Sequence, residues 1–185
     1  MNKKIVLIYG LPGSGKTTLA KALYELMAER CIWFNADKVR STLSSDLTFS
    51  VDARSEQARR MGCLASLSLD GSQKIEFAIV DFVNPTVQTF KAFLVNTRKP
   101  KGEYLNDSIR VPDSFLNEVE YPVYSVFMNT IEKKDSRYAD TNALFEAGSE
   151  LGLEANKPSR IVKQFLQTEK EFKELAKEIL RDLEA

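Results

Sequence analysis

Glycine, lysine and threonine residues with a characteristic spacing lie near the start of the chain. Residues 10–17 read GLPGSGKT, which fits the pattern G-x-x-x-x-G-K-[ST] in full. Because glycine has no Cβ, the main chain of such a loop can turn successive N–H groups toward one point, where a polyphosphate fits. The pattern therefore predicts a loop that binds the phosphates of ATP. The residues that we expect to contact the nucleotide are Gly10, Pro12, Gly13, Ser14, Gly15, Lys16, Thr17 and Thr18.

Two side chains of this loop carry the expected chemistry. Lys16 should reach the β- and γ-phosphates and take part in catalysis, and the Thr17 hydroxyl should complete the ligand shell of a Mg²⁺ ion. The apolar run 5–8 before the loop is typical of a buried parallel strand, and residues 16–29 after it are typical of a helix, whose N-terminus adds positive charge. This order favours nucleotide binding over the alternative of a plain glycine turn before a helix.

Asp37 follows a second strand, which we expect at 31–35. In open α/β sheets ligands bind at the carboxyl ends of the strands, so Asp37 is a candidate catalytic residue that meets an acceptor hydroxyl beside the γ-phosphate. The alternative role is the N-cap of a helix at 38–43, and the two roles are compatible.

Asp81 lies near the end of a continuous apolar run at 75–82, which predicts a further buried strand. A carboxylate in this position is typical of Walker B segments, where it holds a Mg²⁺-bound water. A capping or turn carboxylate is the alternative. Thr17 and Asp81 are therefore the expected metal-site residues.

The composition narrows the class of protein. The chain has 185 residues, which suits one domain, and its 26 basic residues equal its 26 acidic residues, so no global positive charge attracts nucleic acid or a membrane. Histidine is absent, so proton transfer must fall to a carboxylate or to the substrate itself. Cys31 and Cys63 lack a CxxC spacing and are expected to be free buried thiols. No apolar run is long enough to span a membrane, and no signal peptide precedes the first strand, so we expect a cytoplasmic protein.

Residues 34–62, FNADKVRSTLSSDLTFSVDARSEQARRMG, resemble a stretch of the adenylylsulfate (APS) kinase family. That stretch reads D-G-D-N-V-R-x-G-L, then D-L-G-F-S, then D-R-x-E-N-I-R-R-I-G, and the register holds without a gap. The matching positions are Asp37, Val39, Arg40, Leu43, Asp46, Leu47, Phe49, Ser50, Arg54, Glu56, Arg59, Arg60 and Gly62.

The resemblance implies that the γ-phosphoryl group of ATP is transferred to the 3′-hydroxyl of APS, with Asp37 at that hydroxyl. In the family, the residues that match Arg40, Phe49 and Arg54 hold the acceptor nucleotide. Guanidinium groups suit phosphate or sulfate oxygens, and an aromatic ring suits a purine. Gln57 stands where the family has asparagine, and we expect it to contact the acceptor as well.

Residues 82–85 lie over the family's F-I-S-P, which implies acceptor contacts from Val83 and Asn84. Asn84 replaces the serine of that pattern. A phosphorylatable serine is therefore lost, and the contacts to the adenylyl group must differ in detail.

The resemblance weakens beyond Pro85. We expect a short helix at 86–95 that leads into a strand, an insertion at 96–121 and a strand at 123–128. The insertion has three open roles, which are recognition of the acceptor, pairing of subunits as a homodimer, and cover of an edge strand. Residues 131–150 are expected to form a lid-like segment in which Arg137 stabilises the transferring phosphoryl group, although the family's K-G-L-Y-K-type sequence is absent.

A closing helix is expected from 158 or 159 to 183, because apolar residues recur there at helical spacing. The stripe comprises Ile161, Phe165, Phe172, Leu175, Ile179 and Leu183.

The chain is thus expected to be a single α/β domain, residues 1–185, of the three-layer P-loop NTPase type with a mainly parallel sheet of about five strands. The expected activity is ATP- and Mg²⁺-dependent phosphorylation of a small hydroxyl-bearing acceptor, with APS as the first choice. Two alternatives are open. One is a P-loop kinase for another hydroxyl, such as a polynucleotide 5′-end or a modified nucleoside, and the other is a nucleotide-binding regulatory module without catalysis.

Overall fold

A parallel sheet forms the middle layer of the molecule. The computed structural model describes residues 3–95, 97, 121–130, 141 and 158–185. Within them, five strands follow the order β2–β3–β1–β4–β5, and every neighbouring pair is parallel. The strands are β1 (Lys4–Gly10), β2 (Cys31–Asn35), β3 (Phe77–Phe82), β4 (Val123–Met128) and β5 (Arg160–Val162). The expected α/β class with a parallel sheet of about five strands is confirmed.

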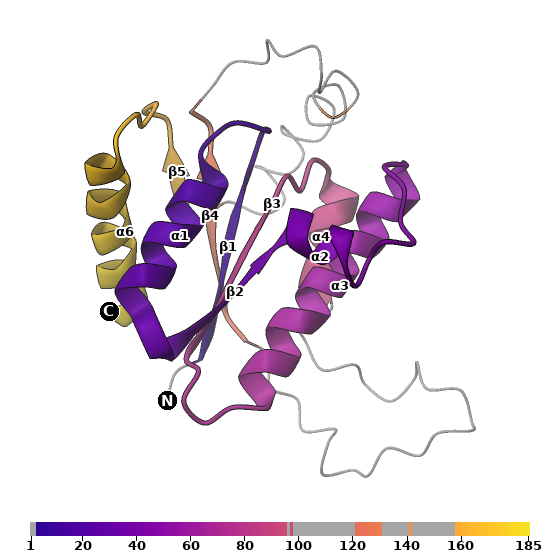
Figure 1. Ribbon diagram of the computed structural model, residues 1–185, viewed down its shortest axis with the longest axis horizontal. Helices are drawn as coiled ribbons and strands as arrows, with labels where there is room; N and C mark the ends of the chain where they lie inside the picture. Colours follow the sequence, from indigo (N-terminus) through magenta and orange to yellow (C-terminus); the bar gives the residue numbers. More distant parts are fainter. Residues whose placement is uncertain (1–2, 96, 98–120, 131–140, 142–157) are drawn as a thin grey trace.

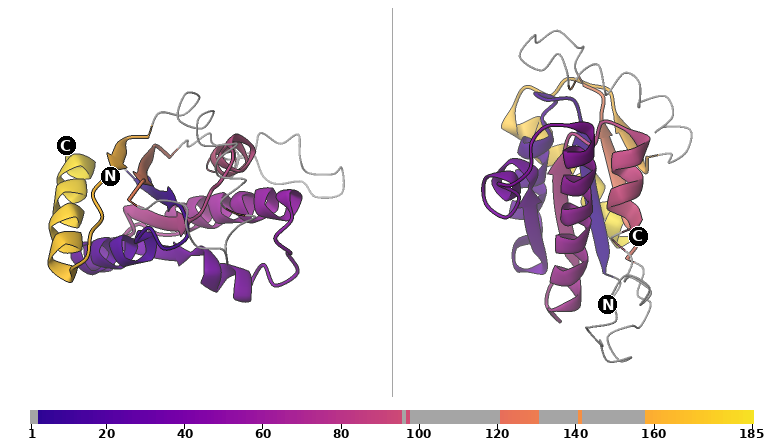
Figure 2. Two further views of the ribbon diagram at one scale, coloured as in Figure 1. Left: turned by 90° about the horizontal axis from the view of Figure 1, so that it is seen from above. Right: turned by 90° about the vertical axis from the view of Figure 1, so that its right-hand side faces the viewer.

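Helices cover both faces of this sheet (Figures 1 and 2). On one face lie α1 (Lys16–Met27) and α6 (Glu169–Glu184), and on the other lie α3 (Val51–Asp70) and α4 (Val87–Val95). The short helix η1 (Ala28–Arg30) follows α1, and α2 (Ala36–Ser41) follows β2 directly. The three expected layers are therefore present.

The central strand β1 is buried on both faces, as its continuous apolar sequence predicts. Because side chains alternate along a strand, Ile5 and Leu7 pack with α3 and α4, whereas Val6 and Ile8 pack with α1 and α6. The two apolar clusters hold β1 from both sides, so the loop that leaves its carboxyl end starts from a rigid support.

The expected closing helix is wrong in its first part. Residues 160–162 form the edge strand β5, which pairs with β4, and the helix begins only at Glu169. Its start is set by a capping box, in which Thr168 and Glu171 each bond the other's backbone N–H. Ile161 and Phe165 consequently do not belong to the stripe and are 43% and 52% exposed. The buried residues of α6 are Phe172, Ala176, Ile179 and Leu183.

The other bounds differ from the expected ones by a few residues. β3 begins at Phe77 rather than at residue 75, and α1 ends at Met27. The insertion expected at 96–121 and the lid-like segment at 131–150 lie outside the described residues except for Thr97, Tyr121 and Thr141. Among the helices of the described residues, none is both long and apolar enough to cross a bilayer.

Candidate active site

The glycine-rich loop joins the end of β1 to the start of α1 at the carboxyl edge of the sheet. Gly15 precedes α1 with a φ of 89°, and a Cβ at this position would lie 2.8 Å from Cζ of Phe172. Gly10 has a φ of 149°, and its Cβ would lie 2.5 Å from the carbonyl oxygen of Met128. Both positions therefore require glycine. No side-chain hydrogen bond caps α1, which leaves its first amide groups available to an anionic ligand.

Lys16 begins α1 and is almost fully buried, with 8% of its surface exposed. Its Nζ donates a hydrogen bond of 2.6 Å to the carbonyl oxygen of Leu11, within the loop. Burial lowers the pKa of Lys16 to about 8, and the nearby carboxylates of Asp81 and Asp37 limit the decrease. The ammonium group is thus bonded to the loop and feels the charge of two acidic side chains.

Thr17 and Asp81 meet across two elements that are far apart in the sequence. Thr17 Oγ1 donates to Asp81 Oδ2 at 2.7 Å, and Asp81 also accepts a hydrogen bond of 2.7 Å from Trp33 Nε1 and one of 3.0 Å from Asn35 Nδ2. Burial raises the pKa of Asp81, while the hydrogen bonds from Trp33, Thr17 and Asn35 and the charge of Lys16 act against the rise. A hydroxyl and a carboxylate are oxygen ligands of the kind that Mg²⁺ prefers beside phosphate oxygens.

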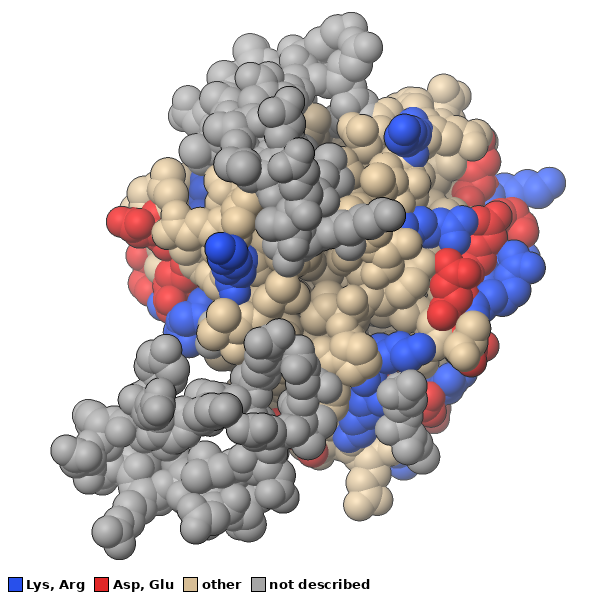
Figure 3. Space-filling view, turned by 180° about the vertical axis from the view of Figure 1, so that it is seen from behind, with Lys and Arg blue, Asp and Glu red and all other residues tan. Residues whose placement is uncertain are grey.

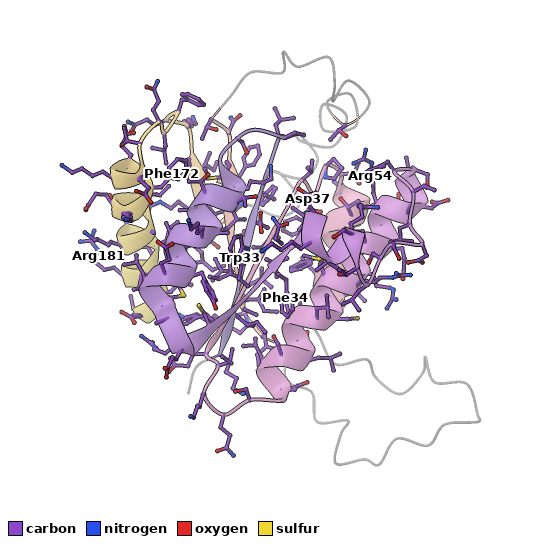
Figure 4. The ribbon with its side chains drawn as sticks, in the orientation of Figure 1. Trp33, Phe34, Asp37, Arg54, Phe172 and Arg181 are labelled. Carbon is purple, nitrogen blue, oxygen red and sulfur yellow. The ribbon has the colours of Figure 1, made fainter. Side chains whose placement is uncertain are left out.

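A cavity of about 260 Å³ lies beside the loop. Residues that we expect to bind phosphate and residues that we expect to bind the acceptor both line it. Lys16, Thr17 and Asp81 line it together with Asp37. Figure 4 shows Asp37 and Arg54 close together at the end of the sheet where α1 begins. The remaining expected residues that line the cavity are Pro12, Gly13, Arg40, Phe49, Arg54, Gln57, Val83 and Asn84.

Phe49 and two arginines form the outer part of the cavity. Phe49 is 66% exposed, and the guanidinium carbons of Arg40 and Arg54 lie 4.7 and 5.6 Å from the centroid of its ring. Burial and the neighbouring charge of Arg54 lower the pKa of Arg40. Two guanidinium groups around one aromatic ring suit a planar ligand that carries negative charge.

Asn84 and Gln57 bring buried amides to the same cavity. Asn84 is 5% exposed and has a φ of 47°, a value that asparagine adopts more readily than most residues with a side chain. Within the described part of the chain, neither Oδ1 nor Nδ2 of Asn84 has a hydrogen-bond partner, and the same holds for Oε1 of Gln57. Buried polar atoms without partners are rare in proteins and suggest a ligand that supplies them.

Not every expected residue reaches the cavity. Gly10, Ser14 and Gly15 shape the loop, and Thr18 lies on α1 and lines a separate hollow together with Phe172 of α6. Arg137 lies outside the described residues, so its role stays a prediction. Arg59 and Arg60 form ion pairs with Glu56, at 2.6 and 2.9 Å. These ion pairs explain the two positive charges without a bound ligand.

The alternative role of Asp37 is wrong, because Asn35 and not Asp37 caps α2. The Asn35 side chain accepts a hydrogen bond of 3.1 Å from the backbone N–H of Lys38, and Asp37 lies within the helix. The sequence correctly predicted a helix cap just after the second strand. It does not show whether Asn35 or Asp37 provides that cap.

Sequence reasoning also missed three residues that complete the site. Trp33 and Asn35 bond Asp81, and Thr141 accepts a hydrogen bond of 2.9 Å from Nη2 of Arg54. The alternation of β2 places Trp33 and Asn35 on one face, which was a usable signal. For Thr141, no local pattern was available, since it meets Arg54 only through the fold.

The chain resembles known proteins in sequence and in fold. A family model described as "Adenylylsulphate kinase" matches residues 2–103, more than half of the chain. The adenylyl-sulfate kinase of Shewanella sp. (strain ANA-3) is 32% identical over 120 residues, which cover 63% of this chain and 56% of that protein. The one of Enterobacter sp. (strain 638) is 36% identical over 115 residues, which cover 51% of this chain and 57% of that protein. The chain thus spans little more than half the length of these curated relatives.

Solved structures extend the likeness in fold to the whole chain. The Mycobacterium tuberculosis APS kinase in complex with AMPPNP and APS aligns with a TM-score of 0.66 at 19% identity, covering 100% of this chain and 99% of that one. The thymidylate kinase of Ehrlichia chaffeensis aligns with a TM-score of 0.56 at 13% identity, covering 100% of both chains. At these identities the two structures show a shared P-loop kinase fold.

Proposed function

Because the chain belongs to the adenylylsulfate kinase family, we propose that it transfers the γ-phosphoryl group of ATP to a hydroxyl group, with APS as the acceptor. The observation that carries this proposal is one cavity that is lined by Lys16, Thr17 and Asp81 and also by Asp37, Arg40 and Arg54. A phosphoryl transfer needs both a phosphate site and an acceptor site that open into one space.

The residues divide the chemistry between them. The loop amides and Lys16 bind and orient the triphosphate, while the outer arginines and Phe49 hold the acceptor. Asp37 accepts the proton of the acceptor hydroxyl as its oxygen bonds to the γ-phosphorus. The bond from that phosphorus to the β–γ bridging oxygen breaks, and ADP leaves with the electron pair.

Thr17 and Asp81 are the residues that would hold Mg²⁺. Their donor set, one hydroxyl and one buried carboxylate 2.7 Å apart, fits a cation that keeps most of its shell from water and phosphate. When bound, the ion neutralises phosphate charge.

An acceptor panel tests the proposal. Purified protein is incubated with labelled ATP, Mg²⁺ and one acceptor at a time, including APS, adenosine 5′-phosphate, a modified nucleoside and a 5′-hydroxyl oligonucleotide. The expected result is formation of 3′-phosphorylated APS with the highest kcat/KM of the panel. If the oligonucleotide or the nucleoside is the better substrate, APS is the wrong acceptor. If none of the panel is phosphorylated and ATP is only bound, the regulatory alternative gains support.

The unpartnered amide of Asn84 is the reason to include other acceptors. In the family pattern a serine occupies its place, and an amide has its donor and its acceptor on two separate atoms, whereas a hydroxyl has both on one oxygen. An Asn84→Ser variant should therefore change the order of preference within the panel more than the affinity for ATP.

A further inference from the structure

Asn35 lies where the phosphate side of the site meets the acceptor side. It is the last residue of β2 and lies opposite Asp81 in the ladder between β2 and β3. Because side chains alternate along a strand, Trp33 points to the same face of the sheet as Asn35, and its ring lies 6.0 Å from that of Tyr24 on α1. Figure 4 shows Trp33 on β2 beside α1.

The NH₂ group of Asn35 faces the carboxylate. It lies 3.0 and 3.2 Å from the two oxygens of Asp81 and 3.4 Å from Oγ1 of Thr17. With Trp33 Nε1 at 2.7 Å from Oδ1, the carboxylate is held by two side-chain N–H donors from one strand. A carboxylate held in this way keeps one orientation relative to Thr17.

The oxygen of the same amide faces the other way. It accepts the backbone N–H of Lys38 and so caps α2, the short helix that carries Asp37 and Arg40. Few side chains can do both tasks. Aspartate caps a helix but cannot donate to Asp81 while ionised, and serine caps a helix but has no NH₂ group.

We propose that Asn35 is a positioning residue that holds the Mg²⁺-binding carboxylate of Asp81 and the start of α2 in one fixed arrangement. The inference rests on the proposed function, because it takes Thr17 and Asp81 as the residues that hold Mg²⁺. The family pattern quoted above has aspartate where this chain has Asn35, so the amide is a feature of this chain.

The pairing of Asn35 with Asp81 also predicts that the two side chains can be exchanged between the two positions. Since Asn35 and Asp81 are partners in the ladder, their amide and carboxylate can trade places. In the double variant Asn35→Asp/Asp81→Asn, the carboxylate lies beside Thr17 from β2, the new amide donates to it from β3, and an oxygen at residue 35 still caps α2.

The test measures Mg²⁺ dependence without an acceptor. Trp33 is the only tryptophan of the chain and its Nε1 donates to Asp81, so we expect its emission to change when a ligand binds at Asp81. Mg²⁺ is titrated into the protein with a non-hydrolysable ATP analogue, and the concentration that gives half of the emission change is recorded. We expect the Asn35→Ser variant to need ~10-fold more Mg²⁺, as is typical when a partner of a metal ligand is lost. The Asp81→Asn variant should need still more, and the double variant should recover at least ~10-fold relative to it.

A second measurement monitors the hydrogen bond by which Asn35 caps α2. Hydrogen exchange of the Lys38 amide, measured by NMR, should stay slow in Asn35→Ser and become faster in Asn35→Ala, because only alanine removes the cap oxygen. Ser50→Ala is the matched control, since Ser50 caps α3 by an equivalent bond to the N–H of Ala53 at 3.3 Å. It should leave the Mg²⁺ requirement unchanged.

Three outcomes would overturn the proposal. These are a wild-type emission that does not respond to Mg²⁺, an Asn35→Ser variant with the wild-type Mg²⁺ requirement, and a double variant no better than Asp81→Asn. Circular dichroism checks that each variant is folded. Failure of the acceptor panel, with the Mg²⁺ shifts still present, would count against the proposed function and not against this inference.

Discussion

Lys16 is the buried, positively charged residue that we expect to bind the nucleotide phosphates. Its pKa is lowered from 10.5 to about 8 by burial. Between pH 8 and 10.5 the folded chain therefore binds fewer protons at this site than the unfolded chain, so the contribution of Lys16 to stability becomes more favourable as pH rises through this window. Below pH 8 the cost of burying the charge is fully present. A bound triphosphate would compensate this cost, because it pairs with the ammonium form.

Nucleotide affinity should consequently fall as pH rises above the pKa of Lys16. We expect the Kd for ADP to rise by about tenfold per pH unit above that point, until the raised pKa of the bound state is reached. Calorimetry at a series of pH values from about pH 7.5 upward measures it. Lys16→Arg is the control, because its charge does not titrate there and its profile should be flat. A flat profile for the unaltered protein would show that the ammonium of Lys16 does not set the affinity.

Asp37 should matter for turnover rather than for ATP binding. It lines the cavity on the acceptor side, within α2. We expect Asp37→Asn to lower kcat by ~100-fold or more while the Kd for ATP stays nearly constant, in line with loss of a positioned base. Asp46→Asn serves as a comparison, because Asp46 forms an ion pair with Arg60 at 2.6 Å away from the phosphate loop. Normal turnover by Asp37→Asn would refute the role of base.

At the scale of elements, α6 supports the phosphate loop from behind. Phe172, in the first turn of α6, is buried and lies against Gly15, so closely that a Cβ on Gly15 would meet its ring. Figure 4 shows Phe172 at the end of α6 that lies beside the start of α1. The C-terminal helix thereby helps to set the shape of a loop that the sequence places near the opposite end of the chain.

Two variants of α6 can separate its effect on the phosphate loop from its effect on the stability of the protein. Phe172→Ala should lower the free energy of unfolding by roughly 3–5 kcal/mol and also weaken nucleotide binding, because the loop loses its backing. Leu183→Ala, at the far end of the same helix and also buried, should cost roughly 2–5 kcal/mol and leave nucleotide binding unchanged. Urea unfolding and calorimetry with ADP measure the two effects. Phe172→Leu is the milder variant if alanine prevents folding, and equal nucleotide affinity in all three variants would exclude a role of α6 in the loop.

For the whole molecule, charge balance separates the two enzyme hypotheses. The chain carries equal numbers of basic and acidic residues, and on the face in Figure 3 positive and negative side chains of the described residues are interspersed. Such a surface does not attract a polyanion over long distances.

Salt should therefore have a small effect on the reaction. We expect the KM for APS to change by only a few-fold between 50 and 200 mM salt, whereas a protein that neutralises many nucleic-acid phosphates loses ~10³–10⁵ in affinity over that range. Steady-state kinetics at several KCl concentrations measure it, with a 5′-hydroxyl oligonucleotide as the comparison. Tight oligonucleotide binding with a steep salt dependence would favour the polynucleotide kinase alternative.

The sequence by itself determined the parts of the site that are local. The spacing of Gly10, Gly13 and Gly15 between an apolar strand and a helix specifies the loop, because backbone freedom and hydrophobic periodicity act over a few residues. Arg40, Phe49, Arg54 and Gln57 converge for a similar reason, since they lie on two consecutive helices and the segment that joins them. Short-range hydrophobic patterns also located β1 to β4. They failed for β5, because its three residues are too few to show a repeating pattern of apolar side chains.

Only the tertiary structure decided how these parts meet. Thr17 finds Asp81, and Asn35 bonds it, because the strand order places β3 between β2 and β1, and no short-range pattern encodes that order. Phe172 reaches Gly15 and Thr141 reaches Arg54 for the same reason. Such contacts depend on which apolar faces pack together, and packing is a property of the whole folded chain rather than of any segment.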